Sequence, residues 1–215
     1  MEEYSTLIQT IALTMGVAWA SGINLYGTLL ALGIMSNTGY VDLPADLQIV
    51  GDPLVLAAAG LMYGVEFFAD KIPGVDTGWD TLHTFVRIPA GALLAASAIG
   101  DVTPAAEMAA AIVGGSLAAG THFTKAGSRI MINTSPEPVS NWTASIVEDI
   151  AVFSGIWVAI AHPYVFIGLL IAFILLMIWL LPKLLRGIKR ILQFFINLFS
   201  GKADNATNSN LPVNK

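Results

Sequence analysis

Two apolar stretches of this chain are too long and too interrupted to be ordinary membrane spans. The first runs from about Ser5 to Met35 and contains Ser21-Gly-Ile-Asn24, and the second runs from about Pro104 to Ile132 and contains Gly120-Thr-His122. About 20 apolar residues are enough to cross the hydrocarbon core of a bilayer. Glycine-interrupted hydrophobic segments at corresponding places in two halves of a chain are typical of transporter binding sites. The pattern therefore predicts two broken helices that meet near the middle of a membrane.

The remaining apolar segments complete an all-α integral membrane protein, a helical bundle of six spans. The expected spans are about 6–35, 53–69, 80–100, 104–132, 142–161 and 163–182. His162-Pro163 separates the last two, because a proline disfavours helical backbone at the residue before it. The transmembrane domain would then occupy residues 1–182.

Six spans divide into two halves of three, at about 5–101 and 104–182. An odd number of spans in each half requires the halves to be inverted relative to one another, which predicts an inverted 3+3 repeat. The corresponding residues are Ala20-Ser-Gly22 with Ala118-Ala-Gly120, and Val65-Glu66 with Val147-Glu148. The alternative is that small residues recur by chance in a chain rich in Gly and Ala.

The composition supports a membrane protein and removes several other classes. Hydrophobic residues make up 55% and charged residues 12% of the chain, whereas a soluble domain carries about 25% charged residues. The sequence has no cysteine, which excludes disulfides and cysteine-ligated metals. It also has no phosphate-binding glycine loop, nucleophile elbow or HExxH motif. We therefore expect no enzymatic activity, no cofactor, no metal and no nucleic-acid partner.

The basic residues set the expected orientation, because cytoplasmic loops carry an excess of Lys and Arg. With six spans and the N-terminus inside, all 10 Lys and Arg residues lie on or near the cytoplasmic side. The loop that carries Asp42, Asp46 and Asp52 then faces outward, and both termini are cytoplasmic. The main alternative makes segment 6–35 a re-entrant hairpin with both ends outside and leaves the later spans unchanged.

The C-terminal segment differs in character from the spans. The basic residues between Lys183 and Arg190 share one helical face, with Leu, Ile and Phe on the other. This pattern predicts a basic amphipathic helix over 183–200 that lies on anionic membrane lipid. Residues 201–215 are polar and rich in Asn, and we expect them to be disordered.

The two interruptions are the first candidate site. In hydrocarbon, unwound backbone survives only beside protein or a watery cavity, and its free N–H and C=O groups can bind an ion or a polar solute. The residues expected to line this site are Ser21, Gly22, Asn24, Gly120, Thr121 and His122. The alternative is close helix packing through small residues. His122 would be a proton relay in the first case and a packed interface histidine in the second.

Ionisable residues inside the spans are the second candidate group, because such residues are costly and are functional hypotheses by default. The carboxylates concerned are Glu66, Asp70, Glu148 and Asp149. Glu66 and Asp70 share one helical face near the cytoplasmic end of the second span. Glu66 could carry a proton, or it could form an ion pair with Arg87 or Lys125.

The segment that follows the second span is the most polar part of the chain. Asp76, Asp80, His83 and Arg87 fall on one face if residues 76–87 are helical. Two carboxylates and a histidine can ligate a metal, but their spacing matches no metal signature. We expect a salt-bridged cytoplasmic loop that gates the cavity, and the plainer alternative is a structural cap.

Three motifs carry a resemblance. They are Ser21-Gly-Ile-Asn-Leu-Tyr26, Phe67-Phe-Ala-Asp-Lys-Ile-Pro-Gly-Val-Asp76 and Trp79-Asp…His83-Thr-Phe…Arg87-Ile-Pro-Ala-Gly-Ala92. Over about residues 8–182 the chain resembles an uncharacterised family of small bacterial membrane proteins, defined only as a domain of unknown function. The resemblance implies a multi-pass protein of the bacterial inner membrane, and it supplies no activity and no catalytic residue.

These observations favour transport or channel conduction of a small solute or ion, with Glu66 and Glu148 as symmetric coupling carboxylates. One alternative is a lipid scramblase or lipid transporter, in which the broken helices open a polar groove to the bilayer. Another is a non-catalytic membrane scaffold. Membrane lipid is an expected partner in each case, and a homodimer is compatible with so small a bundle.

Overall fold

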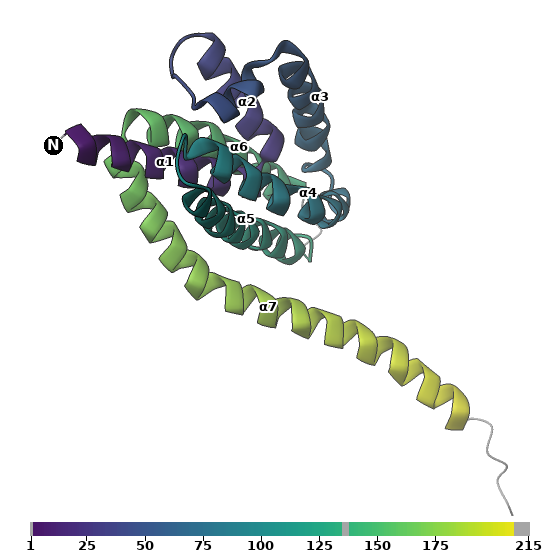
Figure 1. Ribbon diagram of the computed structural model, residues 1–215. Helices are drawn as coiled ribbons and strands as arrows, with labels where there is room; N and C mark the ends of the chain where they lie inside the picture. Colours follow the sequence, from purple (N-terminus) through teal and green to yellow (C-terminus); the bar gives the residue numbers. More distant parts are fainter. Residues whose placement is uncertain (1, 135–137, 209–215) are drawn as a thin grey trace, which may run out of the picture.

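The computed structural model describes residues 2–134 and 138–208, and all regular structure in these two ranges is helical. The elements are α1 (Glu2–Ile23), α2 (Leu25–Asn37), the short 3₁₀ helix η1 (Ala45–Gly51), α3 (Pro53–Ala69), α4 (Val75–Ala98), α5 (Pro104–Ile132), α6 (Pro138–Ala161) and α7 (Pro163–Asn208). Helices α1, α4, α5 and α6 form a bundle, α2 and α3 lie on one side of it, and α7 extends beyond it (Figure 1). The predicted all-α class is confirmed.

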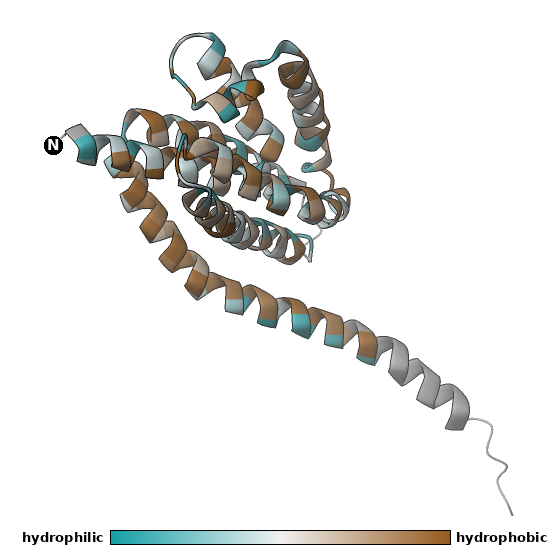
Figure 2. Ribbon diagram, in the orientation of Figure 1, coloured by the Kyte–Doolittle hydropathy of each residue, from teal (hydrophilic) through white to brown (hydrophobic). Residues whose placement is uncertain are grey.

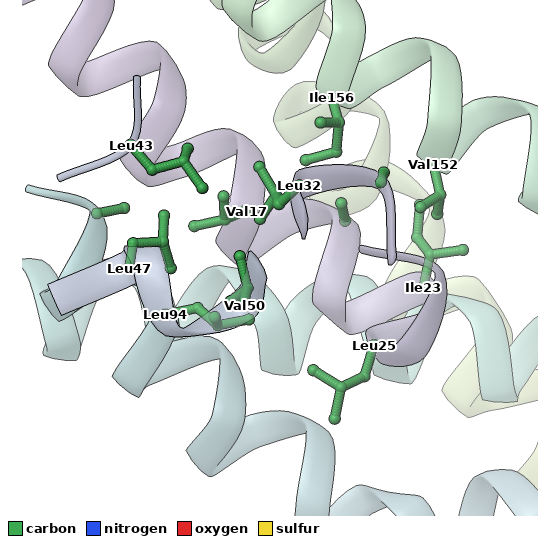
Figure 3. Close-up of a cluster of buried hydrophobic side chains, with 13 residues drawn as sticks. Val17, Ile23, Leu25, Leu32, Leu43, Leu47, Val50, Leu94, Val152 and Ile156 are labelled. Carbon is green, nitrogen blue, oxygen red and sulfur yellow. The ribbon is translucent and has the colours of Figure 1, made fainter. Parts of the chain in front are cut away.

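An apolar core lies between the bundle and the α2–η1 segment. Val17, Leu32, Leu47 and Ile156 come from α1, α2, η1 and α6, and each is at most 1% exposed. Figure 3 shows these side chains converging from the four elements. Since lipid tails are as apolar as leucine, van der Waals contact holds such a core together in a membrane.

Small residues allow α4 and α5 to approach closely. A Cβ atom added to Gly114 would lie 2.2 Å from the Cβ of Ala95, and one added to Gly91 would lie 2.4 Å from the Cβ of Ala118. Neither distance is sterically possible, so only glycine fits at these two positions. This contact sets α4 and α5 side by side, and it therefore positions the polar residues that lie before Gly91 on α4 and after Gly114 on α5.

The first predicted break is confirmed at Asn24. The backbone of Asn24 is extended, with φ −146° and ψ 99°, and its side-chain oxygen accepts a hydrogen bond of 2.8 Å from the N–H of Gly27. Asparagine is a favoured N-cap because it satisfies one of the free N–H groups at a helix start. One residue therefore ends α1 and begins α2.

The second predicted break is wrong. Helix α5 runs from Pro104 to Ile132 without interruption, through Gly120, Thr121 and His122. A glycine inside a helix costs roughly 0.5–1 kcal/mol relative to alanine, which tertiary packing can offset. A Cβ on Gly120 would lie 2.7 Å from the sulfur of Met177, so α7 fills the space that this glycine leaves.

Segment 6–35 is a pair of helices that double back, rather than one broken span. Thr6 at the start of α1 and Tyr40 after α2 line the same cavity, together with Asp101 and Ile160. Both ends of the segment therefore lie at one end of the bundle, as in the hairpin alternative. The single span is wrong because Asn24 turns the chain back instead of letting the helix continue.

The start of α1 and the later part of α7 lie at opposite ends of the bundle (Figure 1). Helix α7 begins beside the cavity and follows α5, with Leu184 against Gly127 and Met131 against Gly187. The six-span scheme, in contrast, places both termini on one side.

Three helical segments of the described chain are long and apolar enough to cross a membrane. They are Glu3–Ile23, Val139–Ala161 and Pro163–Phe194, and a fourth candidate joins Ala45–Gly51 to Pro53–Ala69 across a bend of 63°. Helices α4 and α5, which the sequence predicts as spans, are not among them. The structure places five charged residues of these helices inside the bundle, namely Asp76, Asp80, Arg87, Lys125 and Arg129.

Helix α7 continues through Pro182 and reaches Asn208, so no separate helix begins at residue 183. Its first part is apolar around the whole circumference, and hydrophilic residues follow further along (Figure 2). Residues 201–208, expected to be disordered, continue the helix. Residues 209–215 of the expected tail lie outside the described residues.

Candidate functional site

A buried cluster of charged side chains lies where the end of α3, the end of α5 and the middle parts of α4 and α6 meet. We call it the charge cluster, and it consists of Glu66, Asp70, Asp80, Arg87, Lys125, Arg129 and Glu148. Six of these side chains are at most 4% exposed, and Glu148 is 19% exposed. Four separate segments of the chain therefore supply one ionic site.

Arg87 holds two carboxylates. Its guanidinium donates to Glu66 Oε1 at 2.5 Å and to Asp80 Oδ1 at 2.8 Å. Asp80 and Arg87 lie seven residues apart, which is two helical turns, so the helical periodicity of α4 places both on one face. The predicted face of α4 is confirmed, because Asp76, Asp80, His83 and Arg87 are all buried.

Lys125 sits at the centre of the cluster. Its ammonium lies 2.7 Å from Asp70 Oδ2, and it lies 3.5 Å from both Glu66 Oε1 and Glu148 Oε2. It also donates to the carbonyl oxygen of Ile23, the last residue of α1, at 3.1 Å. The ion pairs proposed as the alternative role of Glu66 therefore exist, with Arg87 at the shorter distance and Lys125 at the longer one.

Arg129 completes the cluster one turn further along α5. It donates to Glu148 Oε2 at 2.6 Å and to the backbone carbonyls of Asp70 and Asn141 at 3.1 and 3.0 Å. This one side chain therefore links the end of α3 to the start of α6. A guanidinium suits this position because its planar fork of donors can serve several acceptors at once.

His122 contacts the cluster through Arg87. Its Nδ1 lies 3.2 Å from Arg87 Nη1, and its Nε2 lies 2.7 Å from the hydroxyl oxygen of Thr84. A guanidinium can only donate hydrogen bonds, so Nδ1 is the acceptor and the ring proton is assigned to Nε2. The Thr84 hydroxyl accepts from it and donates to the carbonyl oxygen of Asp80 at 3.0 Å. His122 is therefore a neutral, packed histidine that orients Arg87.

Several polar atoms of the cluster have no hydrogen-bond partner within the described residues. Among the carboxylates these are Glu66 Oε2, Asp70 Oδ1 and Asp80 Oδ2, all fully buried. Buried polar atoms without partners are uncommon in native proteins, and each needs an explanation. Burying an ion costs several kcal/mol that pairing only partly recovers. Stabilisation of the fold therefore does not account for the cluster, whereas a function would.

Asn24 and Asp149 form a second polar contact next to the cluster. The side-chain amide of Asn24 donates to Asp149 Oδ1 at 3.0 Å, while its oxygen caps α2. The break in the first apolar segment is thus tied to α6. Asp149 is separate from the carboxylates that Arg87 and Lys125 bind.

The other residues predicted to line the site make contacts within or between helices in the structure. Ser21 donates to the carbonyl oxygen of Ala18, and Thr121 donates to that of Leu117, so both hydroxyls bond within their own helices. A Cβ on Gly22 would lie 2.5 Å from the carbonyl oxygen of Ala118. Gly120 faces α7 instead. Gly22 and Thr121 are brought together, whereas Gly120 is directed away from them.

His83, predicted as a gating residue, lies beside the cluster rather than in it. Its ring stacks on Trp79 with centroids 4.1 Å apart, and its Nε2 lies 3.1 Å from the hydroxyl of Tyr26. This contact joins the start of α2 to α4. The side chain is 7% exposed.

Lys71 lies in the turn between α3 and α4, outside the apolar spans. Its ammonium sits 3.0 Å from the centroid of the Phe67 ring and donates to Ser145 Oγ at 3.2 Å. Burial lowers the pKa of Lys71, because removal from water disfavours the charged form. The cation–π contact compensates part of that cost.

Sequence reasoning missed Lys125 and Arg129 as site residues and used them mainly to set the orientation. A signal was present, because His122, Lys125 and Arg129 recur at intervals of three and four residues within an apolar segment. That spacing places all three on one helical face. Polar residues on one face of an otherwise apolar helix indicate a buried polar site.

A cavity of about 900 Å³ lies at the opposite end of the bundle. The carboxylates that line it are Asp42, Asp46, Asp101 and Glu107. Along α5, Glu107 and Lys125 are 18 residues apart, or about 27 Å at 1.5 Å per residue. Leu43 lines the cavity and also belongs to the apolar core, so this core separates the cavity from the charge cluster.

A family described as Domain of unknown function (DUF4126) matches residues 11–183. The match includes α2 to α6, most of α1 and the first part of α7, and it therefore contains the whole charge cluster. Comparison with curated proteins and with solved structures gives no match.

Proposed function

The chain belongs to this family of unknown function, and we propose that it is a transporter or channel for a small solute or ion. The observation that carries the proposal is the charge cluster with its unpartnered carboxylate oxygens. Ionisable groups held inside a membrane protein mark ion and proton pathways more often than they serve stability. The proposed coupling groups are Glu66 and Glu148, the two carboxylates that lie 3.5 Å from Lys125.

The acidic cavity supports the proposal from the other end of the bundle. It gives a polar solute access to the protein interior as far as Leu13 and Leu43, where the apolar core begins. A cavity on one side and a buried ionic site on the other, separated by a packed layer, is an arrangement suited to alternating access. Transport would require that layer to open.

The distribution of charge supports an orientation for the bundle. The basic residues Lys71, Lys183 and Arg186 lie towards the end that holds the charge cluster, and the acidic cavity lies at the other. The positive-inside rule then places the cluster at the cytoplasmic side. This orientation puts the start of α1 outside, which differs from the six-span expectation, and the bacterial inner membrane remains the proposed location.

The inverted repeat remains a prediction. The equal distances of Glu66 and Glu148 from Lys125 support it, because the two glutamates correspond in the predicted repeat. The unbroken α5 does not match the α1–α2 pair. A repeat would therefore involve α3 and α6 more closely than the predicted breaks.

The proposal is tested with purified protein in liposomes on a solid-supported membrane, in steps of protons, common ions and small organic ions. A dye that reports internal pH is recorded in parallel, so that electroneutral proton exchange is also detected. We expect a substrate-dependent signal in the natural protein. The signal should be lost in Glu66→Gln, which keeps the shape of the side chain but cannot exchange a proton.

Asp52→Asn is the matched control. Asp52 is exposed and caps α3 by accepting from the N–H of Leu54, and asparagine can make the same bond. This variant removes one carboxylate outside the cluster and should transport normally. Equal loss in both variants, or equal flux in both, would overturn the coupling role of Glu66.

A lipid scramblase or lipid transporter is the second candidate, because an apolar groove of about 820 Å³ adjoins the acidic cavity. Its walls are α1 and α5, with Thr10, Thr14 and Val113 among the lining residues. Leaflet exchange of a fluorescent lipid in liposomes, absent from protein-free liposomes, would support this role. If both solute flux and lipid exchange are absent, the scaffold alternative stands, in agreement with the tight packing around Gly22.

A further inference from the structure

The ion pairs within the charge cluster are unevenly distributed. Asp70 is paired with Lys125 at 2.7 Å, and Glu148 is paired with Arg129 at 2.6 Å. Each pair joins a carboxylate to its nearest cation, and Lys125 also lies within 3.7 Å of Glu66, Asp80 and Glu148. The remaining cation, Arg87, serves both Glu66 and Asp80. The cluster therefore has one more carboxylate than it has cations, and the excess lies in the Glu66–Arg87–Asp80 triad.

The triad has no access to water that could stabilise the excess negative charge. The side chains of Glu66 and Arg87 are 0% exposed and that of Asp80 is 1% exposed. Glu66 Oε2 and Asp80 Oδ2, the carboxylate oxygens that point away from Arg87, have no hydrogen-bond partner in the described residues. An isolated buried charge costs far more than a neutral polar group, and a carboxylate in such a place takes up a proton instead.

Within the described residues, the surroundings of the triad offer one additional cation, Lys125. The titratable and charged groups that interact with it are Tyr26 from α2, Tyr63 and Asp70 from α3 and its C-cap, His83 from α4, and His122, Lys125 and Arg129 from α5. Lys125 lies 3.5 and 3.7 Å from the triad carboxylates but is closest to Asp70. His122 accepts from Arg87 and so contributes no charge.

We infer that the Glu66–Arg87–Asp80 triad binds one proton at neutral pH, shared between its two carboxyl groups. Two strongly interacting carboxyls titrate as a pair, so the proton belongs to the triad and not to either residue alone. Protonation leaves one carboxylate opposite one guanidinium, which makes the triad electrically neutral. In the described residues no group of three or more His, Cys, Asp or Glu side chains is arranged to hold a metal ion. A proton needs no such group, because it binds to a single carboxylate oxygen.

This inference deepens the proposed function and rests on it for one consequence, namely that the coupling ion is a proton. Release of the proton would leave Arg87 between two carboxylates, and movement of α3 or α4 would expose one of them to water. Loading and release of one proton would then alternate with movement of the helices.

Infrared difference spectroscopy of the purified protein tests the binding of the proton directly, because a protonated carboxyl has a C=O stretch that an ionised carboxylate lacks. We expect this band at neutral pH in the natural protein and its disappearance at alkaline pH. Either Glu66→Gln or Asp80→Asn should abolish it at neutral pH, since each variant leaves one carboxylate paired with Arg87. Asp52→Asn should keep it.

Absence of the band from the natural protein at neutral pH would overturn the inference, and so would retention of the band in either triad variant. The measurement on the natural protein does not depend on the folding of the variants, and circular dichroism checks the variants separately. A band without any solute flux would overturn transport and keep the bound proton. Flux without the band would keep transport and overturn the bound proton.

Discussion

At the scale of single residues, Arg87 is the side chain on which the charge cluster depends most. It neutralises two buried carboxylates, and His122 holds it from the other side by accepting at 3.2 Å. Thr84 in turn orients His122, so a chain of defined donors and acceptors leads from the backbone of α4 to the guanidinium. The orientation of the Arg87 guanidinium is therefore fixed by specific hydrogen bonds.

Replacement of Arg87 by alanine should destabilise the protein strongly. Glu66 and Asp80 would lose their short contacts, and leaving buried charges uncompensated typically costs about 3–5 kcal/mol. Arg186→Ala is the control, since Arg186 is exposed on α7 and its one hydrogen bond within the described residues goes to the carbonyl oxygen of Pro182. Thermal unfolding in detergent measures both. Equal stability of the two variants would show that the triad does not exist as described.

At the scale of elements, helix faces and helix caps could be predicted from the sequence, whereas contacts between helices distant in the chain could not. The shared face of Asp76, Asp80, His83 and Arg87 follows from helical periodicity alone, and the turn at Asn24 follows from its capping chemistry. The continuity of α5 could not be predicted, because it depends on Met177 from a distant helix filling the space beside Gly120.

The ion-pair partners of the buried charged residues could not be predicted from the sequence either. Glu66 could pair with Arg87 or with Lys125, and only the packing of α3 against α4 and α5 decides that it contacts both. The same packing brings His122 to Arg87. A charged residue in an apolar segment indicated a buried functional group. It did not indicate which residues would surround that group.

Packing at Gly22 provides a test at this scale. Gly22→Ala should lower the unfolding temperature, because its Cβ would lie 2.5 Å from the carbonyl oxygen of Ala118 and would push α1 away from α5. Gly64→Ala, in the middle of α3 with nothing within 4 Å of the added Cβ, should instead stabilise by roughly 0.5–1 kcal/mol. A stabilising effect at both positions would contradict the close contact of α1 with α5.

At the scale of the whole molecule, the protein has two chemically different ends. One end holds the charge cluster and is followed by the basic part of α7, and the other carries the acidic cavity. The first apolar segment turns back at Asn24, so the start of α1 and the residues after α2 line the same cavity. In the proposed orientation, this turn places the start of α1 on the side opposite the basic residues.

The absence of cysteine makes this arrangement easy to test. We expect Tyr4→Cys to react with a membrane-impermeant maleimide in intact cells, and Lys189→Cys to react only after permeabilisation. Both side chains are exposed. Labelling of both positions from the same side would contradict the proposed orientation and would agree with the six-span scheme.

The central claim is that the buried charge cluster couples transport, and the most direct measurement compares the natural protein with Glu66→Gln and Asp52→Asn in the same liposomes. The pH dye and the solid-supported membrane are read together while the pH gradient is stepped with each solute. The account predicts a solute-dependent signal in the natural protein and in Asp52→Asn, and none in Glu66→Gln. An undiminished signal in Glu66→Gln, or silence of the natural protein in both readouts, would contradict it.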